Sequence, residues 1–283
     1  MRKITLFAVI LLIMSSILVK ADIFNFSEGG FCSSSSGPWA FKANPAGIVE
    51  NELRRVLLEG TFRLGTNNSR SFSISLVQPP EDSLAGVLNL STDLTDFDVQ
   101  RLSFLYVIAG KAGSTNLGVG LGLDRVQESN GNYYSVFLDL GVQGKFSDSG
   151  YTSYSLALKR LQLWSQKTQE LKLFSVGGGL KLDFEQMVFA FDVAYFFENL
   201  DFWQFVPATQ LNVEPVKLHV SLPFLYKSLN ESNISVEFGV MINLGTVDLG
   251  LSVLYPFSPM NSNDLLKELG YKWHIDFKIG FKW

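Results

Sequence analysis

Large apolar side chains occupy every second position through most of the chain. The segment that ends it, WHIDFKIGFKW, is a clear example, because every odd-numbered position from 273 to 283 is large and apolar. Successive side chains of a strand point to opposite faces, so the segment predicts a strand with one apolar and one polar face. Its apolar face would carry Trp273, Ile275, Phe277, Ile279, Phe281 and Trp283.

The same alternation recurs in about thirteen segments of the chain, which are separated by turn-forming sequences such as TNNS, PPED and KAGST. Clear examples lie at residues 56–64, 72–76, 117–123, 136–142, 154–158, 187–195, 234–244 and 247–255.

Residues 208–224 are too long for one strand and contain Pro215 in their middle. Proline has no N–H to donate to a central ladder, so we expect a hairpin turn at Glu214-Pro215. The count then becomes fourteen strands, with twelve as the alternative. In a membrane barrel, an even number of strands leaves both chain termini on the periplasmic side.

Strands of about ten residues with one apolar face are typical of a transmembrane β-barrel. A bilayer offers no hydrogen bonds, so only a closed sheet satisfies its own backbone there. The alternative is a soluble β-sandwich, which predicts shorter strands and paired apolar faces. The composition is 47% hydrophobic and 13% aromatic, and Tyr and Trp fall near strand ends, where interfacial girdles lie. We therefore predict an all-β fold, a transmembrane antiparallel barrel, with tyrosines and tryptophans of its girdles at positions 133, 151, 164, 195, 203, 255 and 271.

The beginning of the chain predicts export. The chain begins with a short basic segment that contains Arg2 and Lys3, and residues 4–19 are almost wholly apolar. Val19 and Ala21 then occupy the −3 and −1 positions of a site that a signal peptidase would cleave. We expect a signal peptide at 1–21, an N-terminal segment at 22–52 that precedes the barrel, and the barrel at 53–283. An uncleaved anchor is the alternative, but the apolar run is shorter than the roughly 20 residues of a spanning helix.

Charge and cysteine content narrow the partners. Without residues 1–21 the chain has 20 basic and 27 acidic residues, a net charge of −7. An acidic chain without Lys/Arg clusters is a poor nucleic-acid binder. The single cysteine, Cys32, excludes an internal disulfide. Nucleic acid is therefore excluded as a partner, whereas the predicted barrel itself implies a lipid bilayer as one.

A short motif precedes the first barrel strand. Asn44 can cap a short helix that begins at Pro45, and Asn44-Pro45-Ala46-Gly47 resembles the NPAG signature of the long-chain fatty-acid transporter (FadL-like) superfamily of outer-membrane barrels. The layout resembles that of the shorter, PorV-like members most closely, including SLALKRLQ at 155–162 and LKELGYKWHIDFKIGF at 266–281.

The resemblance implies an integral protein of a bacterial outer membrane in which the NPAG segment lies inside the barrel as part of a plug. It implies passive uptake or binding of small hydrophobic compounds. The alternative function is a non-transporting scaffold or docking barrel for secreted or surface-associated proteins. The last strand resembles the C-terminal signal that the barrel insertion machinery recognises, with Trp283 in place of the commoner Phe.

Two sets of residues would lie in the lumen near such a plug. Alternation places Gly118, Gly120, Gly122, Gly177 and Gly179 on the inner face, which favours a wall that the plug approaches closely. Aromatic residues before the NPAG motif would either pack the plug into the barrel or line a pocket for an apolar ligand; they are Phe24, Phe26, Phe31, Trp39 and Phe41.

The polar faces carry no convincing catalytic or metal-binding pattern. His219 with Ser221, and His274 with Asp276, would need a third converging group to form a hydrolase triad, so we expect no enzyme. No cluster has metal-ligand spacing, and no cofactor is expected. Charges of both signs on the inner face favour salt-bridged contacts with the plug over an ion-selective pore. They are Arg55, Glu59, Arg63, Asp124, Asp139, Lys159, Lys181, Asp183, Asp192, Glu237, Asp248, Asp276 and Lys278.

Overall fold

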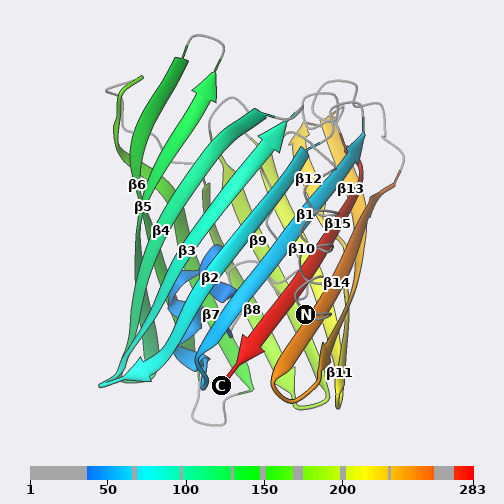
Figure 1. The fold of residues 1–283 in the computed structure, drawn as a ribbon. Helices are drawn as coiled ribbons and strands as arrows, with labels where there is room; N and C mark the ends of the chain where they lie inside the picture. Colours follow the sequence, from blue (N-terminus) through cyan, green and yellow to red (C-terminus); the bar gives the residue numbers. More distant parts are fainter. Residues whose placement is uncertain are drawn as a thin grey trace, which may run out of the picture.

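The chain forms a closed antiparallel β-barrel in a computed structural model (Figure 1). The structure describes residues 37–65, 69–95, 98–128, 131–146, 151–167, 175–197, 202–228, 231–257 and 271–283. The predicted signal peptide at 1–21 and the aromatic residues Phe24, Phe26 and Phe31 lie outside these residues. The prediction of an all-β barrel is confirmed.

The strands follow one another around the barrel in chain order, and β1 pairs with β15 to close it. Their bounds are β1 (Arg55–Gly65), β2 (Ser69–Glu81), β3 (Leu84–Thr95), β4 (Asp98–Ala112), β5 (Thr115–Glu128), β6 (Gly131–Lys145), β7 (Thr152–Ser165), β8 (Ser175–Phe184), β9 (Met187–Phe196), β10 (Phe202–Val213), β11 (Val216–Ser221), β12 (Phe224–Ser228), β13 (Glu231–Asn243), β14 (Val247–Pro256) and β15 (Tyr271–Lys282).

Two of these segments, β11 and β12, occupy a single position in the barrel. Both pair with β10 on one side and with β13 on the other. Pro223 interrupts them because proline has no N–H, yet its carbonyl still accepts a hydrogen bond from the Ser235 N–H at 2.9 Å. The barrel therefore has the predicted fourteen strands, and the hairpin turn lies at the predicted Glu214-Pro215.

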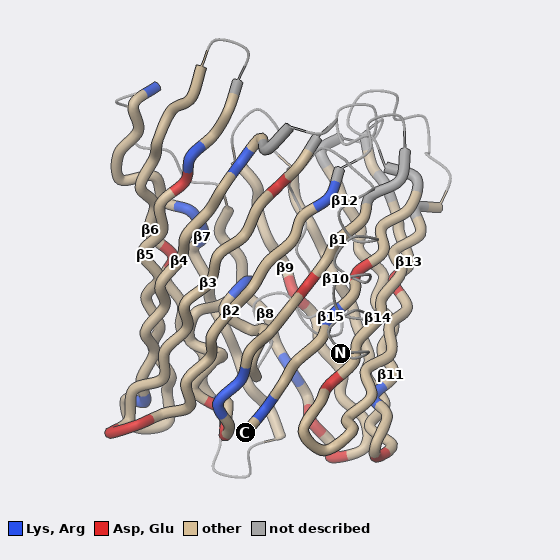
Figure 2. Tube along the Cα trace, in the orientation of Figure 1, with Lys and Arg blue, Asp and Glu red and all other residues tan. Residues whose placement is uncertain are grey.

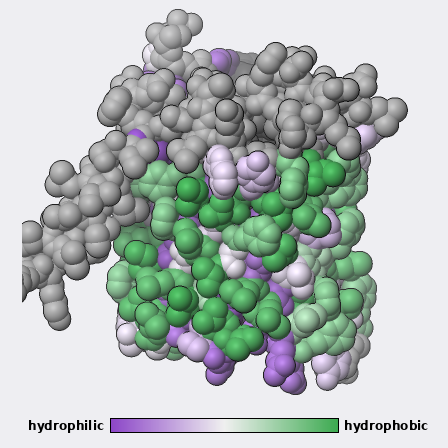
Figure 3. Space-filling model, turned by 90° about the vertical axis from the view of Figure 1, so that its right-hand side faces the viewer, coloured by the Kyte–Doolittle hydropathy of each residue, from purple (hydrophilic) through white to green (hydrophobic). Residues whose placement is uncertain are grey.

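Alternation along β15 separates an outer from an inner face as the sequence predicts. Phe277 is 43% exposed on the outer face, whereas its neighbour Asp276 is 7% exposed on the inner face. Apolar side chains cover much of the outer surface in the same way (Figure 3). Such a surface suits a lipid environment, because isolated soluble proteins rarely expose apolar patches of this extent.

One end of the barrel has short turns, at residues 82–83, 113–114, 185–186, 214–215 and 244–246. We call it the short-turn end; β1 begins there and β15 ends there, at the bottom of Figure 1. Aromatic residues gather toward the other end of the strands. The ring centroids of Tyr195 and Trp203 are 4.9 Å apart, and those of Tyr255 and Trp273 are 4.8 Å apart.

Residues 37–52, which we call the N-terminal segment, lie inside the barrel in its lower half (Figure 1). They contain two short 3₁₀ helices, η2 (Ala40–Lys42) and η3 (Pro45–Glu50), and η3 contacts strands β2 to β6. No helix in the described parts of the chain is long and apolar enough to cross a membrane.

Candidate functional site

The NPAG motif forms the turn that starts η3. Asn44 has an extended backbone, and its side-chain oxygen accepts a hydrogen bond from the Ala46 N–H at 3.0 Å. Pro45 is the first helical residue, where its missing N–H leaves no hydrogen bond unmade. The buried Asn44 amide also donates to the carbonyl oxygens of Val142 in β6, at 3.1 Å, and of Leu156 in β7, at 3.4 Å. One side chain therefore both caps the helix and binds the barrel wall.

Two glycines of the wall let the NPAG motif approach. A Cβ atom at Gly118 would lie 2.4 Å from the Ala46 nitrogen, and one at Gly141 would lie 2.0 Å from Asn44 Oδ1. Real Cβ atoms do not come this close to other atoms, so any larger residue would displace the segment. Gly47 contributes through its backbone, since its carbonyl accepts from the Gly37 N–H at 3.1 Å.

The other glycines that point inward make room for side chains of neighbouring strands. A Cβ atom at Gly122 would collide with the Phe137 ring, and one at Gly177 would lie 3.0 Å from the Cβ atom of Ala194. At Gly120 the nearest atoms belong to Leu105, Asp139 and Val107. The sequence pattern thus identified the inner face correctly but could not separate glycines that meet the N-terminal segment from glycines that meet neighbouring strands.

Trp39 and Phe41 pack the N-terminal segment against an apolar part of the inner wall. They are 1% and 0% exposed, and Ile48 is buried with them. Their partners come from β1, β2, β3, β4 and β6, and are Leu57, Val77, Ala85, Val87, Leu105, Val107, Ala109 and Phe137. We call this set the inner apolar cluster. In the sequence, the inner apolar cluster is marked by a segment whose successive residues are apolar on both faces of the strand, such as residues 104–109. A search for alternation alone does not detect such a segment.

A buried lysine of the N-terminal segment lies against a carboxylate of β1. The Lys42 ammonium forms an ion pair with Glu59 and donates a hydrogen bond to the Ser73 hydroxyl at 3.0 Å. Lys278 of β15 lies 4.0 Å from the same Glu59 carboxylate. Burial, and then the charge of Lys278, lower the pKa of Lys42 to about 7. Lys42 was not among the residues that the sequence assigned to the lumen.

A β-bulge in β7 brings two adjacent cations into the lumen. Asp139 faces β7 where the register shifts, and Arg160 has a φ of +55°. Lys159 forms an ion pair with Asp139, while Arg160 forms one with Asp124 and lies 4.1 Å above the Phe137 ring. Strict alternation would have sent Arg160 to the lipid face, so the sequence analysis missed it.

Further ion pairs follow the closing seam of the barrel. Arg55 of β1 pairs with Asp248 of β14, and Lys282 of β15 lies 3.0 Å from the same carboxylate. The predicted mixed-sign inner face is therefore largely paired where the structure describes it. Arg63, which the sequence also placed there, has a side chain outside the described set.

The two histidines lie beside carboxylates. His274 Nε2 is 3.1 Å from Asp276 Oδ1, and the Ser252 hydroxyl donates to the other Asp276 oxygen at 3.3 Å. In β11, the Ser221 hydroxyl donates to Glu237 at 3.0 Å, while His219 lies 3.6 Å from that carboxylate. The hydroxyl groups thus bind the carboxylates directly, whereas nucleophile activation requires a serine bonded to the imidazole. Among the described residues there is no group of three or more potential metal ligands.

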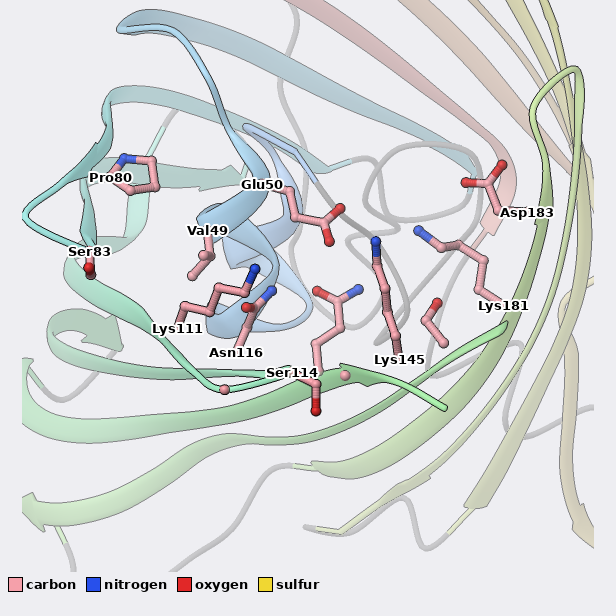
Figure 4. Close-up of a pocket in the computed structure, with 14 residues that line it drawn as sticks. Val49, Glu50, Pro80, Ser83, Lys111, Ser114, Asn116, Lys145, Lys181 and Asp183 are labelled. Atoms are coloured by element: carbon pink, nitrogen blue, oxygen red, sulfur yellow. The ribbon is translucent and has the colours of Figure 1, made fainter. Parts of the chain in front are cut away.

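A pocket of about 680 Å³ lies between the N-terminal segment and the short-turn end (Figure 4). Its wall comes from Pro80 of β2, from β4 to β8 and from the turns at 82–83 and 113–114. Val49 and Glu50 of η3 line it from the N-terminal segment. The lining is mostly polar and contains three lysines, which are Lys111, Lys145 and Lys181.

Comparison with known proteins supports the fold but identifies no sequence relative. No protein-family model matches the chain, and no curated protein matches it. Many solved structures match the fold of this chain, and two of them serve for comparison. The CymD monoaromatic hydrocarbon channel is 10% identical with a TM-score of 0.63, covering 89% of this chain and 94% of that channel.

The second is the toluene transporter TodX of Pseudomonas putida, which is 11% identical with a TM-score of 0.60. The similarity covers 94% of this chain and 99% of that one. At such low identity the likeness establishes the fold alone. The fold is the one that the resemblance to FadL-like barrels implies, while membership of that superfamily and a closer relation to its PorV-like members stay predictions.

Proposed function

We propose that this chain is an integral outer-membrane barrel that takes up or binds small hydrophobic compounds. The observation that carries the proposal is the fold: this chain matches CymD and TodX over almost their entire length. CymD is described as a monoaromatic hydrocarbon channel and TodX as a toluene transporter. In this proposal the short-turn end faces the periplasm, as in other barrels of this kind.

The inner apolar cluster supports the same function. Most inward positions of β13 to β15 are polar or charged, whereas β9 and β10 present apolar residues to the lumen, including Val188, Phe202 and Val206. Strands β3 and β4 likewise present Val87, Leu105 and Val107 there. Trp39 and Phe41 cover this apolar wall. A hydrophobic compound that displaced these two rings would find an apolar surface of matching character, and the buried surface would favour its binding by about 25 cal/mol per Å².

Accumulation of labelled toluene tests the proposal in bacterial cells that lack their own hydrocarbon channels. Cells that produce the chain should accumulate toluene faster than cells with an empty vector. The purified protein should bind the compound saturably in detergent. If neither accumulation nor saturable binding exceeds the empty-vector and detergent controls, a role in hydrocarbon uptake is wrong.

A scaffold or docking barrel is the second candidate. The observation that favours it is the number of ion pairs inside the lumen, including Lys159 with Asp139 and Arg55 with Asp248. These ion pairs would have to break before the lumen could open, and a scaffold does not require it to open. Purification from the native membrane separates the two candidates: stoichiometric protein partners without hydrocarbon binding would favour the scaffold.

A further inference from the structure

The pocket at the short-turn end contains cations that lack a partner. Most described lysines of the lumen are paired: Lys42, Lys159, Lys278 and Lys282 each have a carboxylate oxygen within 4.0 Å. Lys111 and Lys145 also belong to inward-facing positions, yet within the described part of the chain neither has an ion pair or a hydrogen bond. The positive charges of these two lysines are therefore available to a ligand from outside the chain.

The strand register places these two lysines on one wall of the pocket. Lys111 is two residues beyond the inward-facing Ala109 of β4, and Lys145 is two residues beyond the inward-facing Gln143 of β6. Strand β5 lies between them and contributes Asn116. Lys181 enters from β8, and the labelled side chains surround a common space in Figure 4.

The charge and polarity of the lining select the kind of ligand. Three lysines face two carboxylates, those of Glu50 and Asp183, so the pocket is positive inside a chain whose net charge is −4. Ser83, Ser114 and Asn116 add neutral side chains that can donate hydrogen bonds. Lysine binds phosphate as a point charge, and a volume of about 680 Å³ lies within the range of small-molecule sites.

We infer that this pocket binds a phosphate oxyanion through Lys111 and Lys145, at the short-turn end beneath the N-terminal segment. The site is separate from the proposed uptake of hydrophobic compounds, because a hydrocarbon has no charge for these lysines to bind. The phosphate comes either from a free inorganic or organic phosphate or from the head group of a phospholipid at the barrel rim.

Binding by the full-length protein in neutral detergent tests the site. The probes are inorganic phosphate, followed by ³¹P line broadening, and phosphatidylglycerol in mixed micelles, followed by retention of the lipid on the protein. The variant is Lys111→Gln with Lys145→Gln, which removes both charges and keeps the side-chain length. The matched control is Lys217→Gln, an exposed lysine beside the turn at 214–215 of the same end but outside this pocket.

We expect saturable binding of at least one probe by the wild-type protein, a loss of at least about tenfold in the double variant, and a change below about twofold in the control. Phosphate alone would identify a solute site, and the lipid alone would identify a head-group site.

The inference is wrong if wild type binds neither probe, or if the double variant binds as wild type does. Equal losses in Lys217→Gln would also overturn it, because the effect would then come from the charge of the whole end. Unchanged heat-modifiable gel migration shows that each variant is folded.

Discussion

The side chain of Asn44 donates a hydrogen bond to the carbonyl oxygen of Val142, 98 residues away, at 3.1 Å. The same side chain caps η3 by accepting from the Ala46 N–H. The start of η3 and its contact with the barrel wall therefore both depend on the Asn44 side chain. Detachment of the N-terminal segment would leave its buried polar groups to be satisfied by water, so the cap and the wall contact should be lost together.

Asn44→Ala is therefore expected to loosen the N-terminal segment while the barrel stays folded. Loss of an asparagine cap costs typically about 1 kcal/mol, and the unpaired groups left behind add to this cost. Hydrogen exchange should speed up at Ala46 and Gly47, with heat-modifiable gel migration unchanged. Unchanged exchange of both amides would show that Asn44 does not hold the segment.

Gly141→Val tests the close approach from the side of the wall. The added Cβ atom would lie 2.0 Å from Asn44 Oδ1, so the N-terminal segment must move away. We expect limited proteolysis to cut within residues 37–52 faster than in the wild-type protein. Gly86→Ala is the matched control, because its new Cβ atom meets nothing closer than 3.9 Å. Equal protection in Gly141→Val and wild type would contradict the docked position of the segment.

Much of the fold follows from the sequence because a period of two is a direct consequence of strand geometry. The alternation in residues 273–283 and the proline at 215 were enough to place the last strand and the β10–β11 hairpin. The terminal aromatic, Trp283, continues the outer face, and its N–H donates to the Arg54 carbonyl at 3.2 Å. Its role in assembly stays a prediction.

The interior was less predictable, because contacts there join residues that are remote in sequence. Arg160 entered the lumen only because a bulge reverses the alternation after Lys159. The pairing of Lys42 with Glu59 depends on how the N-terminal segment lies across the barrel, which no local pattern specifies. Of the five aromatics proposed for packing or ligand binding, Trp39 and Phe41 pack in the inner apolar cluster, and the other three lie outside the described residues.

The Arg160–Asp124 pair should show the energetics of a partly buried salt bridge. Replacing only Arg160 with leucine leaves the Asp124 carboxylate, which also accepts from the Ser103 hydroxyl, without its closest cation, although Arg101 stays 3.9 Å away. The loss should therefore lie below the cost of about 3–5 kcal/mol for breaking a fully buried pair. Arg160→Leu combined with Asp124→Leu should recover much of the loss. Urea-induced unfolding in micelles measures both, and a double variant as unstable as the single one would refute this account.

The low pKa of Lys42 makes docking of the N-terminal segment depend on pH. Burial and Lys278 lower this pKa to about 7, whereas Asp276 and Asp93 oppose the shift; in the detached segment it would return toward 10.5. Between these values the detached form binds more protons, so docking strengthens as the pH rises, by up to about tenfold per unit. Below about pH 7 both forms are protonated and the dependence disappears.

Protease protection of residues 37–52, measured from pH 6 to pH 10, checks this sign. Protection should increase above pH 7 in the wild-type protein. Lys42→Met removes the titrating group, so its protection should stay constant over the same range. Protection that falls with rising pH would mean that the ion pair with Glu59 outweighs the cost of burying the ammonium group.

The depth of each outer-face residue in the bilayer should set the cost of a charge there. Phe277 lies opposite Gly60 in the middle of β1, and its ring centroid is 5.7 Å from that of Phe62. Phe281 lies opposite Val56, near the short-turn end. Lysine costs about 2–4 kcal/mol at the midplane of a bilayer and about 0–1 kcal/mol near its interfaces. Phe277→Lys should therefore destabilise the barrel more than Phe281→Lys does, as measured by reversible unfolding in phospholipid vesicles.

The two residues share type, strand and face, so the comparison isolates depth. Equal losses would contradict a membrane-spanning β15, because a water-facing strand has no gradient of polarity along its length.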